Sequence, residues 1–460
     1  MKPRLALSMI VRNASRDLSR CLESMRGIVD EMVLADTGST DDTIAIARAA
    51  GAHVASIPWE NDFAKARNRA LVELRSRSSA GWILTLDADE MLDSRAADAI
   101  APLLRAEDYA GYTVPIRNYF RSRNTRIWDV AAVENDNRLP ASREFPAFVA
   151  HGNVRLFRCD PEIYFVARVH ESVGPRILEL GRKVRQCDLI IHHFGSAADA
   201  ETMARKNAFY RELGREKVRD MPNNAQAHFE LGLLEFDNFH DYPAACSCFS
   251  RACELAPRLA VAWLFLGLAR LRLKSYEEAL TALDRCERLG YAAPLLAETK
   301  GDVFYNLARF RESSRCYERA LRKSAENVAL ESKLGLSMLR TGRKDKGMLL
   351  LRAAPLKQPE LAELHDRLIQ AHVWLGNLAE AASAAESKLD TCPLLTPADF
   401  LRPASIRAQL GEIERAKILA RRGLAAFPHF PRLLSVLSEL EAPQNAPPTS
   451  PLLSNAGKAS

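Results

Sequence analysis

The amino-acid sequence predicts two structural classes in one chain, an α/β domain with a mixed, mostly parallel sheet and then an all-α array of helical repeats. Three observations support this prediction. Apolar strand patterns alternate with helical patterns over residues 5–90, the order that builds a parallel sheet covered by helices. Glycines recur every 34 or 35 residues between Gly232 and Gly335. A chain of 460 residues is also too long for a single ordinary core.

The first ninety residues supply the α/β pattern. Strands are expected at 5–11, 32–35, 53–57 and 82–86. Helices are expected between them at 18–25, 43–50 and 63–74. Residues 111–195 are less regular, with strand-like runs at 111–116, 154–157 and 189–192. We expect these runs to extend the sheet in a mixed, partly antiparallel arrangement.

The second half of the chain is helical and repeats itself. A charged linker helix is expected at 201–220, and the period of the glycines at 232, 267, 301 and 335 is that of helix-turn-helix units. Small residues are expected where paired helices approach closely. Two weaker units carry Gly376 and Gly411, which gives about six repeats. This half resembles the tetratricopeptide repeat (TPR) family, although the tryptophan expected four residues before each glycine survives only as Trp263.

These patterns set the expected domain boundaries. Residues 1–200 form the α/β domain, 201–224 the linker helix and 225–430 the repeats. Residues 442–460 are rich in proline, serine, asparagine and alanine and are expected to be disordered.

Composition excludes several classes of protein. With 47% hydrophobic and 27% charged residues, the chain has the composition of a soluble globular protein. The formal charge of +6 contains no basic block, which argues against a nucleic-acid partner. No window reaches the roughly 18 apolar residues of a membrane span, and the N-terminus lacks a signal peptide's apolar run. Nine scattered cysteines indicate reduced thiols and a cytoplasmic location, with attachment to the inner membrane left open.

The chemistry concentrates where the strand at 82–86 ends in Asp87-Ala88-Asp89-Glu90. Asp87 and Asp89 project to the same side of an extended segment, at the strand end where open α/β sheets bind ligands. Two carboxylates on one side suit a divalent cation that carries phosphate. The alternative is an acidic loop that caps the next helix, with Asp93 or Ser94 as N-cap.

The turns after the first two strands limit which kinds of nucleotide-binding site are possible. The first turn, Val11–Asp17, contains no glycine, so both the dinucleotide-binding glycine motif and the P-loop are excluded. A bound nucleotide must then be held by side chains and a metal. Asp36 ends the second strand, where a carboxylate can accept hydrogen bonds from a nucleobase or ribose. The alternative is that Asp36 serves only the turn.

Four blocks in order carry a resemblance to a known family. They are LSMIVRN at 7–13, VDEMVLADTGSTD at 29–41, WENDFAKARN at 59–68 and LDADE at 86–90. Together they resemble the inverting family 2 glycosyltransferases of GT-A fold, over roughly residues 4–195. Asn13 departs from many relatives in being followed by alanine instead of an acid.

The resemblance implies a role for each matching position. Asp36 would bind the base and Asp87 the ribose and base side of the nucleotide. Asn13, Arg67 and Asn68 would complete the nucleotide-sugar site, although a helix-surface position is the alternative for Arg67. Asp89 would hold Mn²⁺ or Mg²⁺ against the diphosphate.

Inversion also requires a base for the acceptor's proton. Glu171 is the first candidate and His170 the second, because GT-A enzymes often supply an acid in this region. A simple ion pair of Glu171 with Arg168 is the alternative. His193 is preferred to His192 as a further metal ligand. No His-Glu-x-x-His motif is present, which argues against a zinc peptidase.

The sequence therefore predicts a metal-dependent, inverting hexosyltransferase whose donor is a nucleotide sugar, with UDP as the expected nucleotide. Two alternatives stay open, an inactive nucleotide-sugar-binding scaffold and a nucleotidyltransferase, although the latter usually carries a glycine-rich loop. Two classes of acceptor stay open, a protein or peptide and a cell-envelope glycan. The repeats would bind the acceptor or a protein partner, or mediate self-association.

Overall fold

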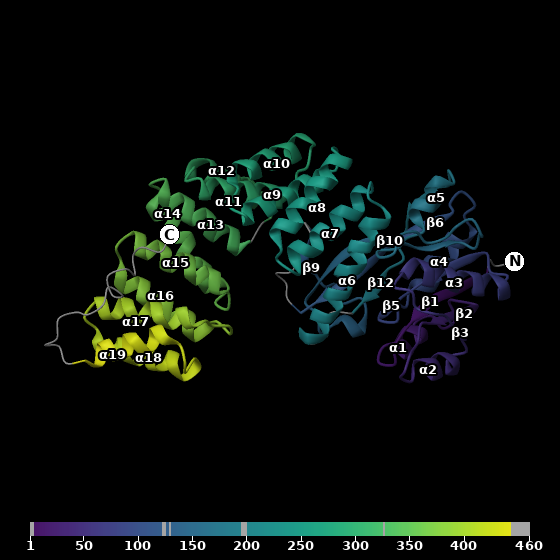
Figure 1. The fold of residues 1–460 in the computed structure, drawn as a ribbon, viewed down its shortest axis with the longest axis horizontal. Helices are drawn as coiled ribbons and strands as arrows, with labels where there is room; N and C mark the ends of the chain where they lie inside the picture. The colour runs from purple at the N-terminus through teal and green to yellow at the C-terminus, as the bar shows by residue number, and fades with distance from the viewer. Residues whose placement is uncertain (1–3, 122–125, 128–129, 195–199, 325–326, 443–460) are drawn as a thin grey trace. The chain divides into compact units, whose positions relative to one another are not determined.

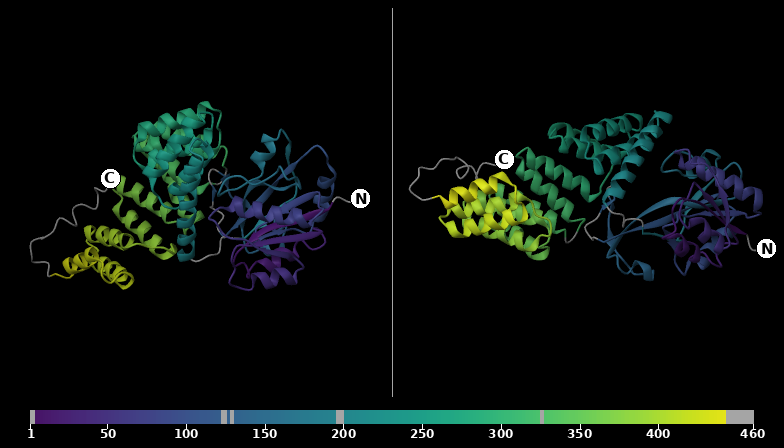
Figure 2. Two further views of the ribbon diagram at one scale, coloured as in Figure 1. Left: turned by 45° about the vertical axis from the view of Figure 1, so that its right-hand side comes forward. Right: turned by 60° about the horizontal axis from the view of Figure 1, so that its bottom comes forward.

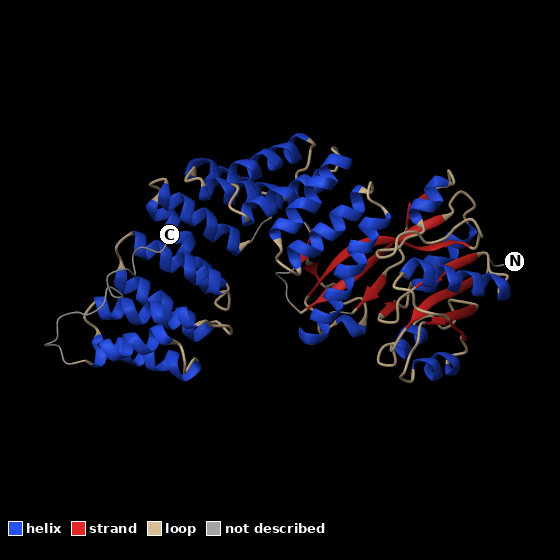
Figure 3. Ribbon diagram, viewed as in Figure 1, coloured by secondary structure: helices blue, strands red, loops and turns tan. Residues whose placement is uncertain are grey.

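The computed structural model of the chain describes residues 4–121, 126–127, 130–194, 200–324 and 327–442. The chain divides into two compact units, residues 1–257 and 258–460. Among the described residues, the strands belong to the first unit and the second is built of helices (Figure 3). The segment expected to be disordered lies almost wholly outside the described residues, which end at Ala442.

The first unit is organised around one mixed sheet. Its main strands run in the order β3 (His53–Ser56), β2 (Glu31–Asp36), β1 (Leu5–Val11), β4 (Trp82–Thr85), β10 (Ala147–Arg158), β6 (Gly111–Phe120), β12 (Ile191–His193) and β5 (Glu90–Leu92). The first four are parallel, β10 is antiparallel to both neighbours, and β12 runs parallel to β6. The expected mixed extension of the parallel sheet is therefore confirmed.

Short strands complete this part of the chain. β9 (Val133–Glu134) pairs with β10, and β11 (Val184–Gln186) pairs with β6. β7 (Arg126–Ile127) and β8 (Val130–Ala131) form a separate pair. A single 3₁₀ turn among the described residues covers Pro140–Ser142.

Helices cover both faces of the sheet (Figure 1, Figure 2). α1 (Leu18–Glu23), α2 (Thr43–Ala49) and α4 (Ala96–Arg105) pack on one face with the alternate residues Leu5, Leu7 and Met9 of β1. α3 (Phe63–Arg77) and α5 (Gly174–Glu179) pack on the other face with Ala6 and Ile83. Because successive side chains of a strand point to opposite faces, the uninterrupted apolar runs of β1 and β4 suit a sheet buried on both sides.

The structure corrects the alternative interpretation of the acidic stretch. Asp87 to Asp89 form a turn between β4 and the short strand β5, which pairs with β12. α4 begins only at Ala96, with Arg95 as its N-cap, and the Asp93 carboxylate accepts a bond from the Arg95 backbone (3.0 Å). Asp87 and Asp89 are thus not capping residues.

Helical pairs follow the sheet. α6 (Ala200–Asp220) leads to the pair α7 (Ala225–Asp237) and α8 (Tyr242–Leu255), which belongs to the first unit. The second unit holds five further pairs within the described residues: α9 (Ala260–Arg272) and α10 (Tyr276–Arg288), α11 (Pro294–Asn306) and α12 (Phe310–Leu321), α13 (Val328–Arg340) and α14 (Lys344–Lys357), α15 (Ala362–Trp374) and α16 (Leu378–Thr391), and α17 (Pro397–Gln409) and α18 (Ile413–Ala426). α19 (Pro431–Glu441) packs on α18.

The periodic glycines lie where the helices of a pair approach each other. A Cβ atom built on Gly232 would stand 2.6 Å from the Phe249 ring, and one on Gly267 would stand 2.6 Å from Leu283. Real Cβ atoms do not come so close. The glycine period in the sequence therefore reflects the close packing of the helices within each pair, as expected for TPR units.

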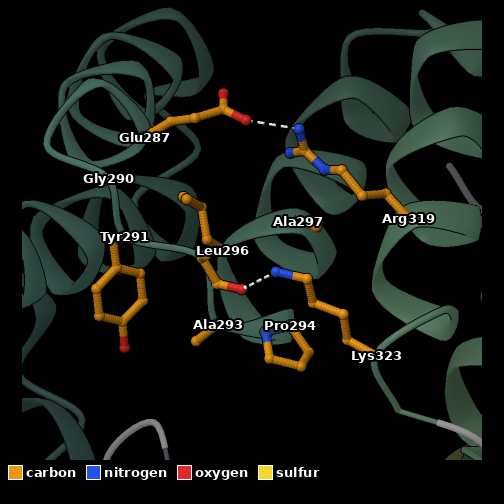
Figure 4. Close-up of a pocket in the computed structure, with 10 residues that line it drawn as sticks. Glu287, Gly290, Tyr291, Ala293, Pro294, Leu296, Ala297, Arg319 and Lys323 are labelled. Atoms are coloured by element: carbon orange, nitrogen blue, oxygen red, sulfur yellow. Dashed lines mark hydrogen bonds and ion pairs between the residues drawn. The ribbon is translucent and has the colours of Figure 1, made fainter.

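Charged side chains link neighbouring pairs on the surface of the second unit. Between α10, α11 and α12 lies a cavity of about 280 Å³ (Figure 4). At its rim Arg319 donates to Glu287 (2.5 Å), and Lys323 donates to the carbonyl of Ala292 (2.7 Å). The first contact joins α10 to α12, and the second joins the segments that follow these two helices.

Candidate active site

The carboxyl ends of β1, β2 and β4 meet at one edge of the sheet. Val11 pairs with Asp36, and Ser8 pairs with Thr85. Asn13, Asp36 and Asp87, which follow or end these strands, are thereby brought to the same edge. Ligands bind at this edge in open α/β sheets.

Asn13 and Asp36 organise the two turns at this edge. Asn13 has a positive φ of 48°, and its side-chain oxygen accepts from the backbone of Thr40 (2.8 Å). The buried Asp36 carboxylate accepts from the backbone N–H groups of Gly38 (3.0 Å) and Ser39 (3.1 Å). Both side chains therefore have a structural task in the turns, whatever they contribute to a ligand.

Arg67 lies at the centre of a buried charge network. Its Nη2 donates to Asp87 (2.6 Å), 20 residues away in the sequence, and its Nε donates to Glu171 (2.5 Å), 104 residues away. The guanidinium side chain is only 6% exposed. Burial works against its charge, but the carboxylates of Asp87 and Glu171 raise the pKa of Arg67 above its ordinary value. Arg67 is therefore not a helix-surface arginine.

Helix α3, which carries Arg67, sets the position of this side chain. Asp62 caps α3 by accepting from the backbone of Lys65 (2.9 Å). Asn68 does not reach the charge network: its amide donates to the carbonyl of Phe165 (2.9 Å) and accepts from the Phe165 backbone (2.8 Å). Asn68 thus ties α3 to the segment that leads to Glu171.

Glu171 pairs with Arg67 and not with Arg168. Arg168 instead donates to Asp220 (2.9 Å) and pairs with Glu216 (3.1 Å), both on α6. The alternative of a simple ion pair with Arg168 is therefore wrong. His170 has a positive φ of 53°, is exposed, and lines a small cavity with Tyr210.

Sequence reasoning missed Arg155 and Glu90, which complete the network. Arg155 donates to Asp87 (3.0 Å) and to Glu90 (2.9 Å), and Glu90 also accepts from the backbone of Asp87 (2.7 Å). Burial raises the pKa of Glu90 to about 7. Burial would also raise the pKa of Asp87, but Arg67 and Arg155 hold it below its ordinary value. An arginine inside the apolar strand at 154–157 was the available signal, since unpaired charges are rarely buried.

Asp89 faces His193 across the sheet edge. His193 Nε2 lies 3.1 Å from the Asp89 carboxylate, and its Nδ1 lies 2.8 Å from the side-chain oxygen of Asn118. Strand pairing places His193 opposite both Glu90 and Asn118. Burial lowers the pKa of His193, but the Asp89 carboxylate outweighs burial and raises it.

His192 points away from this pair. It is fully buried and its Nδ1 lies 2.8 Å from the hydroxyl of Tyr119. Gly195, which ends the predicted stretch, lies outside the described residues.

The pair of Asp89 and His193 fits a divalent cation that is shared with a diphosphate. Both side chains are about a third exposed, and their donor atoms are adjacent. In the part of the chain that the structure describes, no three His, Cys, Asp or Glu side chains form a metal-binding group. Mg²⁺ is typically held by one or two carboxylates together with substrate phosphates and water, so Asp89 with one further donor fits such a site.

Helix α6 also reaches the site through Tyr210. Its ring stacks on Phe63 of α3, with ring centroids 6.0 Å apart and an interplanar angle of 13°. Burial, and then the charges of Asp87 and Glu171, raise the pKa of Tyr210 to about 12. No local pattern in the sequence indicates that a tyrosine of the linker helix lies beside the strand ends.

No helix among the described residues is long and apolar enough to cross a membrane.

Comparison with known proteins shows which family the chain is similar to. The model of the glycosyl transferase family 2 matches residues 7–163. An uncharacterized glycosyltransferase of Rickettsia felis is 32% identical over 47% of this chain and 71% of its own length.

Two further relatives match smaller shares of their own length. A TPR repeat-containing protein of Synechococcus elongatus is 30% identical over 50% of this chain and 52% of that protein. The SPbeta prophage-derived glycosyltransferase SunS of Bacillus subtilis is 24% identical over 37% of this chain and 35% of that protein. The chain thus matches about half of the first of these relatives and about a third of the second.

Proposed function

The chain belongs to the family 2 glycosyltransferases. We propose that its first unit transfers a hexosyl group from a nucleotide sugar to an acceptor with inversion. The expected donor is a UDP sugar. The observation that carries this proposal is the buried Arg67, which joins the donor-side carboxylate Asp87 to the candidate base Glu171. One side chain thereby fixes the position of a donor-binding group relative to that of the group that would take the acceptor's proton.

The donor would lie over the carboxyl ends of β1, β2 and β4. Asp36 and Asn13 would contact the base through the turns that they organise, and Asp87 would accept from the ribose. Arg67 and Arg155 keep Asp87 ionised and fixed, since both donate to it. A carboxylate held in this way is preorganised as a hydrogen-bond acceptor.

Asp89 and His193 would hold Mn²⁺ or Mg²⁺ against the diphosphate. The cation would stabilise the negative charge that grows on the leaving nucleoside diphosphate. Asn118 supports this arrangement because its contact with Nδ1 of His193 orients the imidazole and leaves Nε2 beside Asp89.

Glu171 would take the proton from the acceptor. Within the described residues, Oε1 of Glu171 accepts from Arg67 and Oε2 has no hydrogen bond, so Oε2 is left to receive the proton. The side chain is 12% exposed, which keeps bulk water away from the reacting atoms. His170 remains the second candidate for this role.

Buried charges favour an enzyme over an inactive scaffold. Arg67, Arg155 and Glu90 are all almost fully withdrawn from solvent. Removing charges from water costs several kcal/mol for each ion, and a buried pair is often no better for stability than apolar residues. A scaffold would have no reason to keep this network, whereas an active site does. We place the reaction in the cytoplasm, where nucleotide sugars would reach the chain.

A donor-hydrolysis screen tests the proposal. Wild type and Asp89→Ala would be incubated with several nucleotide sugars and Mn²⁺, and release of the nucleoside diphosphate would be measured. We expect at least one donor to be hydrolysed by wild type, with a loss of about a hundredfold or more in Asp89→Ala and on chelation of the metal. Asp98→Ala on α4 is the matched control, because it removes an exposed acid of the same unit. If wild type neither binds nor hydrolyses any donor, the scaffold is the better interpretation.

A further inference from the structure

A small cavity lies beside the charge network, between the segment that carries Glu171 and helices α6 and α7. Its volume is about 130 Å³, and every residue that lines it belongs to the first unit. Its apolar wall comes from Val169, Leu231 and Leu234. His170, Asn207 and Tyr210 supply polar atoms around it.

The one ion pair in the wall is satisfied within the protein. The Lys217 ammonium donates to the carbonyl of Val169 (2.8 Å) and to Glu230 (2.7 Å). Lys217 is only 5% exposed, and its charge is balanced by these two partners. The described lining therefore offers no unpaired lysine or arginine to a phosphate or carboxylate, and an uncharged group suits the apolar wall best.

The volume limits the occupant to a single small group. An engineered protein cavity of about 150 Å³ holds one benzene molecule, whereas sites for drug-sized ligands span roughly 300–1,000 Å³. At about 130 Å³ the cavity matches one apolar amino-acid side chain and is too small for a nucleotide sugar. It is also too small for the long tail of a polyprenyl carrier, and its apolar wall is poorly suited to a hydroxyl-rich sugar ring.

Two residues connect the cavity to the catalytic groups. His170, in its wall, is followed directly by Glu171. Tyr210 lines the cavity while its ring rests on Phe63 of α3. Its hydroxyl makes no hydrogen bond to any residue that the structure describes, and burial, followed by the charges of Asp87 and Glu171, raises its pKa to about 12. A group seated in the cavity would bring the adjoining part of its molecule to Glu171.

We propose that this cavity is the acceptor subsite, and that it takes one apolar side chain of a peptide next to the residue that receives the sugar. The inference rests on the proposed function and names the acceptor class for it. The first helical pair would then be part of the substrate site, and Tyr210 would position the acceptor.

Ligand-observed saturation-transfer NMR on the full chain tests this assignment. The probes are N-acetyl-leucinamide for a peptide, N-acetylglucosamine for a glycan, geranyl phosphate for a lipid carrier, and UDP for the donor site. The variants are Leu234→Trp, which fills the cavity, and Leu434→Trp on α19, which is the exposed control. Asn207→Trp, at the polar side of the cavity, replaces the first variant if Leu234→Trp does not fold.

We expect N-acetyl-leucinamide to bind wild type and the control, and to lose about tenfold or more in affinity when the cavity is filled. UDP binding should be the same in all three proteins. Equal binding of the amide after filling, or no binding to wild type, overturns the assignment. Binding of the sugar or of geranyl phosphate that disappears on filling also overturns it. If UDP does not bind to wild type, the result would instead count against the proposed function.

Discussion

At the scale of single residues, Arg67 is the side chain on which the candidate site depends. It uses two different nitrogen atoms to reach Asp87 and Glu171, and lysine cannot reproduce this because its charge sits on one atom. Arg155 supports the same carboxylate from the opposite strand. The two arginines therefore hold Asp87 from two sides and leave Glu171 dependent on Arg67.

We predict that Arg67→Lys lowers kcat/KM for donor hydrolysis by about 10- to 150-fold, because a charge-assisted hydrogen bond contributes roughly 1.5–3 kcal/mol. Arg69→Lys is the matched control, since Arg69 lies on the same helix and pairs with the exposed Glu60. Steady-state kinetics of both variants check the prediction. Equal losses in the two variants would mean that the effect comes from α3 and not from the network.

A second residue-scale prediction separates the two candidate bases. Glu171→Gln keeps the size of the side chain but removes its ability to take a proton, so we expect transfer to fall by about 10²- to 10⁴-fold while UDP binding persists. His170→Gln should change transfer by less than about tenfold, because the His170 side chain makes no hydrogen bond to the charge network among the described residues. Transfer rates and UDP titrations of both variants decide between them. A large loss only in His170→Gln would exchange the two roles.

At the scale of elements, regular patterns were predictable from sequence and tertiary contacts were not. β1 spans the expected residues 5–11, and the other strands of the first ninety residues end within two residues of their expected limits. Alternating apolar periods are local properties, which is why they could be read. Arg155 meets Glu90 only because β10 lies antiparallel beside β4, and no local pattern reports that pairing. Short β5 was missed for the same reason.

The packing of helical pairs gives a stability prediction. Gly267→Ala would place a methyl group against Leu283, 2.6 Å away, so we expect a loss of about 1–3 kcal/mol in the free energy of unfolding. Leu283→Ala in the same chain should recover part of that loss, because it makes room for the methyl group. Chemical denaturation of the two single variants and the double variant measures the coupling. Simple additivity of the two losses would show that the contact is not the cause.

His372 on α15 gives a prediction for pH. Burial lowers its pKa, with help from Arg352 on α14 and against the opposing charge of Glu380 on α16. As the pH falls below about 6.5, the unfolded chain binds a proton that the folded helix takes up less readily, so stability that is present above that pH is lost. His372→Gln should show a smaller loss between pH 7 and 5. Thermal unfolding of both proteins across this range checks it, and parallel slopes would contradict it.

At the scale of the whole molecule, the helices after the sheet belong in part to the catalytic unit. The first compact unit extends to residue 257 and so includes α6, α7 and α8. Lys217 of α6 donates to the carbonyl of Val169 (2.8 Å), and Arg168 pairs with Asp220 (2.9 Å). The segment that carries Glu171 is thus held from one side by α3 and from the other by α6. The first helical pair, α7 and α8, belongs to the same compact unit as the sheet.

This division leads to a prediction for truncated chains. A chain of residues 1–257 keeps all the contacts of α6 with the sheet, and we expect it to hydrolyse the donor within a few-fold of the full rate. A chain that ends at residue 199 lacks Tyr210 and Lys217, so Phe63 loses its contact with the Tyr210 ring and the Val169 carbonyl loses its hydrogen bond from Lys217. Leaving a buried polar group unpaired costs about 1–3 kcal/mol, and the loosened Glu171 segment should lower hydrolysis by at least about tenfold. Circular dichroism and hydrolysis rates of both chains test this. If the shorter chain is folded and as active as the longer one, α6 and the first helical pair are dispensable for the donor half of the reaction, and their role would have to lie with the acceptor alone.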